Sequence, residues 1–159
     1  MKSKKPARLR LDEFLPYRLS IASNAVSKAI ARAYDERFGL SIPEWRIIAV
    51  LSEIESGTQQ DLVCRTLMDK VAVSRAAQSL VTRGLVERRP DSGDGRAYRL
   101  TLSQSGAALY ARIAPAALDY ERRLLARFRK DEINALSDML TLLANAASIL
   151  AEEDAQPPR

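Results

Sequence analysis

The sequence predicts a mainly α-helical protein that carries one small β-hairpin. Over most of the 159 residues, apolar side chains recur at steps of three and four, which is the period of an amphipathic helix. Near residue 85 this period gives way to alternation, which is typical of strands. Capping residues and glycines divide the helical stretches into separate segments.

The first predicted helix covers residues 11–38. Gly39 ends it, because glycine readily adopts the left-handed conformation found at helix C-termini. We expect residues 1–10, which are basic, and residues 152–159 to be disordered tails. The apolar stripe of this helix consists of Leu15, Leu19, Ala22, Val26, Ala29, Ile30 and Ala33.

The second predicted helix begins at a capping box. Ser41 and Glu44 lie three residues apart and can satisfy unpaired backbone N–H groups, and Pro43 is tolerated in the first turn. We expect Gly57 to end this helix. Its predicted buried stripe consists of Ile47, Ile48, Leu51 and Ile54.

Two shorter helices follow. Residues 58–61 form a second capping signature, which opens a helix that extends to Arg65. Asp69 is placed to cap the next helix, and Gly84 closes it. The apolar positions of that helix follow the helical repeat and are Val73, Ala76, Ala77 and Leu80.

The hairpin and the C-terminal helices complete the chain. Residues 85–90 and 97–102 read as two strands around a turn-rich segment, and they predict one antiparallel hairpin. Ser103 is placed to cap a long helical region that Pro115 kinks. A break at residues 129–131 precedes the last helix. Its stripe is too regular for a lone surface helix and consists of Ile133, Leu136, Leu140, Leu143, Ala147 and Leu150.

Composition narrows the classes of function that this chain can have. The net charge of +5 and the isoelectric point near 9.6 favour a polyanionic partner such as nucleic acid, although a solvated basic surface is the alternative. The single cysteine and the absence of histidine exclude an internal disulfide, a Cys/His zinc site and a histidine general base. We therefore predict no enzyme, no catalytic residue, no metal and no cofactor. Short apolar runs and the lack of a secretory signal lead us to expect no membrane span and a cytoplasmic location.

Two short helices, a tight turn and a hairpin together describe a winged helix-turn-helix. The residues resemble the MarR (multiple antibiotic resistance regulator) transcription factors over residues 11–150. The most specific matches lie at residues 68–75, at Leu80, and at residues 84–88, 94–96 and 102–106. The resemblance implies a DNA-binding lobe at residues 41–102 and a helical dimerisation region formed by residues 11–40 and 103–151.

DNA recognition would use the helix that Asp69 caps. Arg75 is suited to a bidentate contact with guanine and Gln78 to adenine, and the alternative for Arg75 is a phosphate contact alone. Thr58 and Gln59 are placed to hold a phosphate through backbone N–H groups at the start of the preceding helix. The predicted contacts from the recognition helix itself are Lys70, Val71, Ala72, Ser74, Arg75 and Gln78.

By resemblance, the tip of the hairpin is a second contact. Arg96 would enter the minor groove, where the negative potential is concentrated. Asp94 would orient Arg96 or brace the wing. Gly95 departs from the charged or polar residue common in the family, which removes one phosphate contact. Further candidates for phosphate contacts are Arg88, Arg89 and Arg99, and simple solvation is the alternative for Arg89.

The resemblance also implies a homodimer that meets a pseudo-palindromic duplex operator, with an intramolecular helix pack as the alternative. The implied function is a repressor released by a small, aromatic, anionic ligand. Alternatives are an effector-independent or architectural DNA-binding protein and a redox regulator based on Cys64, which we expect to be a partly buried hydrophobe. For Trp45 a role in the core is the alternative to ligand contact. The candidate ligand residues are Tyr17, Arg18, Ala22, Trp45, Arg46 and Ala49.

Overall fold

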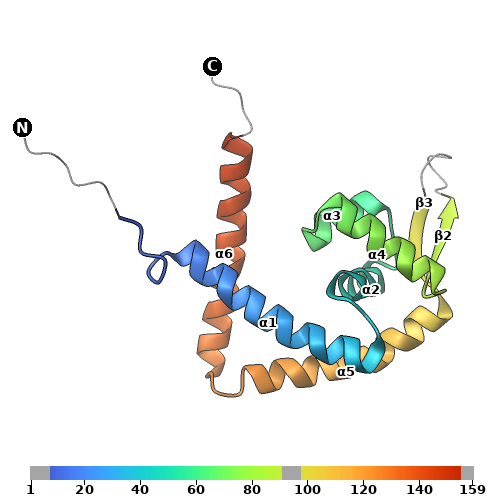
Figure 1. Ribbon diagram of the computed structural model, residues 1–159, viewed down its shortest axis with the longest axis horizontal. Helices are drawn as coiled ribbons and strands as arrows, with labels where there is room; N and C mark the ends of the chain where they lie inside the picture. Colours follow the sequence, from blue (N-terminus) through green and yellow to red (C-terminus); the bar gives the residue numbers. More distant parts are fainter. Residues whose placement is uncertain (1–7, 91–97, 155–159) are drawn as a thin grey trace, which may run out of the picture. The chain divides into compact units, whose positions relative to one another are not determined.

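The computed structural model describes residues 8–90 and 98–154 and confirms the mainly helical fold with a small sheet. It divides into two compact units, Met1–Pro115 and Ala116–Arg159, so the division falls at Pro115, inside a helix (Figure 1). The elements are α1 (Leu15–Phe38), α2 (Ile42–Ile54), β1 (Ser56–Gly57), α3 (Gln59–Thr66), α4 (Lys70–Thr82), β2 (Val86–Pro90), β3 (Tyr98–Leu102), α5 (Gln104–Leu124) and α6 (Lys130–Asp154).

The core of the first unit lies among α2, α3, α4 and the sheet. The helical stripes predicted for α2 and α4 are buried, except that Ile54 is only half-buried. In Figure 1 these helices gather beside the β2–β3 hairpin. Burial of this apolar surface holds the short helices together, because helices of this length are marginal in water on their own. The largest fully buried side chains are Leu40, Ile47, Ile48, Leu51, Leu62, Leu80, Leu100, Ile113 and Val73.

The sheet has three strands rather than the two predicted from the sequence. Its order is β1-β3-β2, and both pairings are antiparallel, with Gly57 opposite Leu100 and Val86 opposite Leu102. The prediction that Gly57 ends the second helix was wrong. That helix ends at Ile54, Glu55 takes a positive φ of 62°, and Gly57 lies in β1. A strand of two residues has no periodicity for a sequence to display.

The start of α5 is tied to the end of α4. Ser103 caps α5 as predicted, because its hydroxyl accepts a hydrogen bond from the Gly106 N–H at 3.0 Å. The same hydroxyl donates to the Gly84 carbonyl at 2.7 Å, and the Ser103 N–H donates to the Leu85 carbonyl at 3.0 Å. These bonds attach the start of α5 to the segment between α4 and β2. Beyond this attachment, α5 is helical through Pro115.

Helix α1 starts at Leu15, four residues later than predicted, with Pro16 in its first turn. Proline is accommodated there because the first helical N–H groups have no partner within the helix. Much of the apolar surface in the first turns is exposed, including Leu15, Tyr17, Leu19 and Ile21. Within the single chain, the predicted stripe of α1 is therefore only partly covered.

Helix α6 extends to Asp154, three residues into the segment predicted to be a disordered tail. None of its residues is buried, although its stripe is apolar. Among the described residues, α6 is the one helix long and apolar enough to cross a membrane by length and composition. The sequence-based expectation of no such segment missed it because the charges of α6 cluster at its ends, with Asp138 alone between Ile133 and Ala151. Length and composition are weak grounds for a span, since a helix that packs against protein passes the same test.

Candidate nucleic-acid interface

Helix α4 has the construction of a recognition helix. Asp69 caps it, and its carboxylate accepts a hydrogen bond from the Ala72 N–H at 2.8 Å. Val73, Ala77 and Leu80 are buried against the core. This anchoring turns the opposite side of α4 to solvent, where four of the predicted DNA contacts are exposed. They are Val71, Ser74, Arg75 and Gln78.

The other predicted contacts on α4 are arranged differently. Ala72 is half-buried and lines a groove of about 300 Å³ between α4 and the start of α2, together with Arg75. Lys70 is exposed at the start of α4 and does not line this groove. Gln78 has an intrahelical neighbour, because its amide donates to the Thr82 hydroxyl at 3.5 Å.

A second groove, of about 270 Å³, lies beside the start of α4. It brings together the first turn of α3 and residues of β2 and β3, among them Gln59, Lys70, Arg88 and Tyr98. Two cations and the positive end of a helix dipole suit this groove to a phosphate group. Sequence reasoning named three of these four residues but could not place them in one groove.

The role predicted for the Thr58 backbone needs correction. The Thr58 N–H donates to the Asp61 carboxylate at 2.8 Å, and the Thr58 hydroxyl accepts from the Asp61 N–H at 3.1 Å. The Thr58 N–H is therefore already paired and does not face a phosphate. Hydrogen bonds to the Asp61 carboxylate from the backbone N–H and the side chain of Thr58 lower the pKa of Asp61, so this end of α3 carries a negative charge that partly opposes the helix dipole.

The three arginines in the described part of the wing have different partners. The guanidinium of Arg88 lies 4.8 Å from the centre of the Tyr98 ring, on the groove side of the hairpin. Arg89 pairs with Glu87 at 2.8 Å on the exposed surface. Arg99 was predicted as a phosphate contact, but it donates to the hydroxyl and carbonyl of Ser56 at 2.8 and 2.9 Å and so binds β3 to β1. Asp94, Gly95 and Arg96 lie outside the described residues.

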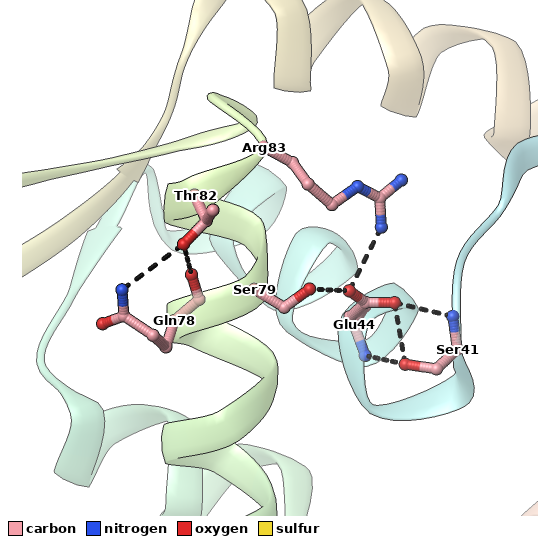
Figure 2. A network of polar contacts seen from close by, with 6 residues as sticks. All are labelled: Ser41, Glu44, Gln78, Ser79, Thr82 and Arg83. Carbon is pink, nitrogen blue, oxygen red and sulfur yellow. Dashed lines mark hydrogen bonds and ion pairs between the residues drawn. The ribbon is translucent and has the colours of Figure 1, made fainter.

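Glu44 has a larger role than the capping box predicted for it. It caps α2 as expected, and its carboxylate also accepts hydrogen bonds from Ser79 of α4 at 2.6 Å and from Arg83, the C-cap residue of α4, at 3.1 Å (Figure 2). Burial raises the pKa of Glu44, but the hydrogen bonds from Ser79 and Ser41 and the charge of Arg83 outweigh it, and the net pKa is lowered. No periodicity in the sequence signals this contact, because its partners are far apart along the chain.

Known proteins share this architecture. The profile of the MarR family matches residues 38–97. A MarR/EmrR family transcriptional regulator from Acinetobacter sp. ADP1 is 29% identical in sequence and superposes with a TM-score of 0.82, covering 88% of this chain and 99% of its own. Residues 38–97 of the chain therefore carry a MarR-family domain, and the fold of MarR-family regulators extends over most of the chain.

Two further relatives add detail to this MarR-family assignment. The homoprotocatechuate degradative operon repressor of Escherichia coli is 27% identical over 105 residues, which cover 66% of this chain and 71% of the repressor. A mutant MarR from E. coli, whose structure was solved with operator DNA, is 21% identical and has the same fold, with a TM-score of 0.76 and coverage of 86% of this chain and 99% of that one. These relatives regulate transcription, and this chain shares with them the MarR-family match at residues 38–97 and the fold.

The residues predicted to bind a ligand do not come together within the single chain. Trp45 stacks on Tyr110 with ring centres 6.1 Å apart and contacts Tyr34 at 5.1 Å, which makes it part of an aromatic cluster. Ala22 precedes Tyr34 by 12 residues on α1, or about 18 Å at a rise of about 1.5 Å per residue. Tyr17 and Arg18 lie farther away still. The other two candidates are the exposed Arg46 and the half-buried Ala49.

Cys64 is exposed, contrary to the prediction of a partly buried hydrophobe. It lies on the outer side of α3, where the Gln60 amide approaches its sulfur at 3.5 Å. The buried position of this short helix is Leu62. In the part of the chain that the structure describes, no three acidic, cysteine or histidine side chains cluster as metal ligands would.

Proposed function

We propose that this regulator binds a pseudo-palindromic duplex operator as a homodimer and represses transcription until a small aromatic anion releases it. The observation that carries the proposal is the exposed face of α4 beside the basic groove. Ser74, Arg75 and Gln78 would read base edges in the major groove. Lys70 and Arg88 would hold the adjoining backbone phosphates, because they line one groove with the first turn of α3.

The wing supplies the second part of the proposed contact. Arg96 would reach the minor groove beyond the hairpin, with Asp94 as its brace, as the family resemblance implies. Arg88 supports this arrangement because it emerges from the strand that leads to the tip and lies over Tyr98. A contact at each end of the lobe would orient it on the duplex.

Dimerisation is proposed from the exposed apolar surfaces of α1 and α6. Each helix carries large apolar side chains that the single chain leaves in solvent, such as Leu19 on α1 and Leu140 and Leu143 on α6. Covering such side chains contributes about 25 cal/mol for each Å² removed from water. We therefore assign residues 11–40 and 103–151 to a dimerisation region, which also accounts for the apolar α6 without a membrane.

Repression and ligand release are proposed from the named relative. The E. coli repressor controls an operon for the degradation of homoprotocatechuate, which is an aromatic carboxylate. In this chain Tyr34, Trp45 and Tyr110 form an aromatic cluster in which Trp45 and Tyr110 are half-buried. Arg46 directly follows Trp45 in the sequence and supplies a cation for a carboxylate. A ligand would release the DNA by binding one arrangement of the dimer's two DNA-binding lobes more tightly than the arrangement that fits the operator.

Operator selection tests the DNA part of the proposal. The full-length protein is used to select duplexes from a random library, and the enriched fragment is compared with a scrambled duplex of equal length. We expect an enriched inverted repeat, and loss of binding of about 5- to 100-fold when Arg75 is replaced by alanine. Arg96→Ala should weaken binding and leave the dimer intact, whereas recovery of no enriched sequence would refute sequence-specific binding.

Effector release has a separate test. Aromatic carboxylates, including homoprotocatechuate, are added to the protein–operator complex in a mobility-shift titration. We expect at least one to release the DNA and to raise the melting temperature of the free protein. If the complex withstands the whole panel but dissociates on oxidation of Cys64, redox control replaces ligand release. If neither treatment affects it, the protein is an effector-independent DNA-binding protein.

A further inference from the structure

One carboxylate joins the start of α2 to the recognition helix. Glu44 is 7% exposed, and its two oxygens have separate partners. Oε2 accepts from the N–H and the hydroxyl of Ser41, both at 2.8 Å, which completes the cap of α2. Oε1 accepts from the Ser79 hydroxyl at 2.6 Å and from the Arg83 guanidinium at 3.1 Å. The cap requires only the first oxygen, so the second is available to hold α4.

The two partners on α4 lie on the same side as a predicted base contact. Arg75, Ser79 and Arg83 are spaced four residues apart and therefore form one stripe along the helix. Arg75 lines the groove between α4 and α2 that Glu44 and Ser79 also line. Gln78 directly precedes Ser79 in the chain and points outward (Figure 2).

We propose that Glu44 is a positioning residue for DNA recognition, which sets the rotation of α4 about its own axis and so aims Arg75 and Gln78. Glu44 itself does not touch DNA. The proposal rests on the proposed function, since it presumes that the outer face of α4 reads base edges.

The core decides which face of α4 is buried, because Val73 and Leu80 are fully enclosed, but it restrains small rotations about that orientation only weakly. At the middle of its buried face α4 presents Ala76 and Ala77, whose side chains are too small to interlock deeply with neighbours. Apolar burial is also non-directional. Hydrogen bonds to an ionised carboxylate are short, strong and directional. They therefore supply the restraint on rotation that the small side chains do not.

A small rotation would be enough to disturb base reading. Side-chain atoms of a helix lie about 5–6 Å from its axis, so a turn of about 20° moves them by about 2 Å. Hydrogen bonds to a base edge need donor–acceptor distances of about 2.7–3.2 Å. A shift of that size removes a bidentate contact, whereas contacts to phosphates by long flexible side chains can follow it.

The test compares specific with non-specific binding. The probes are a duplex that the wild-type protein selects from a random library and a scrambled duplex of the same length and composition. We expect Glu44→Gln to lower the ratio of the two affinities about tenfold, the range for one lost base contact, with little loss of affinity for the scrambled duplex. The control is Glu53→Gln, which removes the same charge from an exposed position of α2 and should keep the wild-type ratio.

Two serine variants separate positioning from stability. Ser79→Ala removes a partner of Oε1 and leaves the cap of α2 intact, so it should lower the affinity ratio about as far as Glu44→Gln. Ser41→Ala weakens the cap and should lower the melting temperature while keeping the ratio. Unchanged ratios in folded Glu44→Gln and Ser79→Ala would overturn the proposal. A wild-type protein that selects no sequence would instead refute the proposed function.

Discussion

Replacing Gly106 by alanine tests how closely α5 must approach the DNA-binding lobe. A Cβ atom at Gly106 would lie 2.0 Å from the Leu85 carbonyl oxygen, and real Cβ contacts essentially never fall below 3.0 Å. The start of α5 and the residue before β2 must then separate by about 1 Å. That oxygen also accepts the hydrogen bond from the Ser103 N–H, so the separation weakens the junction as well.

The expected loss of stability can be worked from these contacts. Forcing an extra methyl group into a packed site costs about 1–3 kcal/mol, and a weakened hydrogen bond adds about 1 kcal/mol. Alanine favours the helical state by up to about 1 kcal/mol over glycine, which acts in the opposite direction. The net expectation is a loss of about 2 kcal/mol, or about 4–8 °C in melting temperature for a chain of this size.

Thermal and urea unfolding of Gly106→Ala beside Gly84→Ala measure this effect. Gly84 has a φ of +68°, and a Cβ atom added there would meet no atom within 4 Å, so alanine costs only the left-handed conformation, about 1 kcal/mol. Both changes restrict the unfolded chain equally, so the difference between the two variants, after allowance for the left-handed conformation at Gly84 and the helix propensity at Gly106, reports the clash at Leu85. A Gly106→Ala protein that melts at or above the wild-type temperature would refute the reasoning.

Three further predictions concern other parts of the lobe. Leu67 is 86% exposed and has a φ of 51°, so Leu67→Gly should raise the free energy of unfolding by up to about 1 kcal/mol; a loss in urea titrations would mean that this side chain packs. The pKa of Glu44 is lower in the folded protein than its value of about 4.3 in the unfolded chain. Ionised Glu44 therefore stabilises the fold above that pH, and this stability is lost as the pH falls through the folded pKa. In chemical denaturation, the wild type should lose more stability than Glu44→Gln between about pH 5 and about pH 3. Arg88→Ala should reduce the salt dependence of DNA binding by about one phosphate contact, whereas Arg99→Ala should lower stability with no such change, because Arg99 ties β3 to β1.

Much of the lobe could be predicted because its signals are local. Ser41, Thr58 and Asp69 each cap the helix expected of them, since a capping hydrogen bond spans only two or three residues. The buried face of α4 followed from the helical repeat, and with it the exposure of Arg75 and Gln78. The candidate recognition helix was therefore readable without coordinates.

Sequence reasoning failed where a contact joins distant segments. The strand β1, the tie of Arg99 to Ser56 and the grouping of Lys70 with Arg88 all depend on how the elements fold back on one another. The same applies to the ligand candidates, because single-residue chemistry put Tyr17 and Trp45 in one set although the length of α1 separates them.

The sequence by itself determined the mainly helical class, the caps, the apolar stripes and the outward face of α4, because each depends on the spacing of residues close together in the chain. Only the tertiary structure decided which arginines face the groove and which brace the sheet, and that Glu44 reaches across to Ser79 and Arg83. These are long-range contacts, and side-chain type and local period carry no information about their partners. The recognition helix is thus specified by residues close together in the chain, while Glu44, which is far from it in sequence, sets its rotation about its own axis.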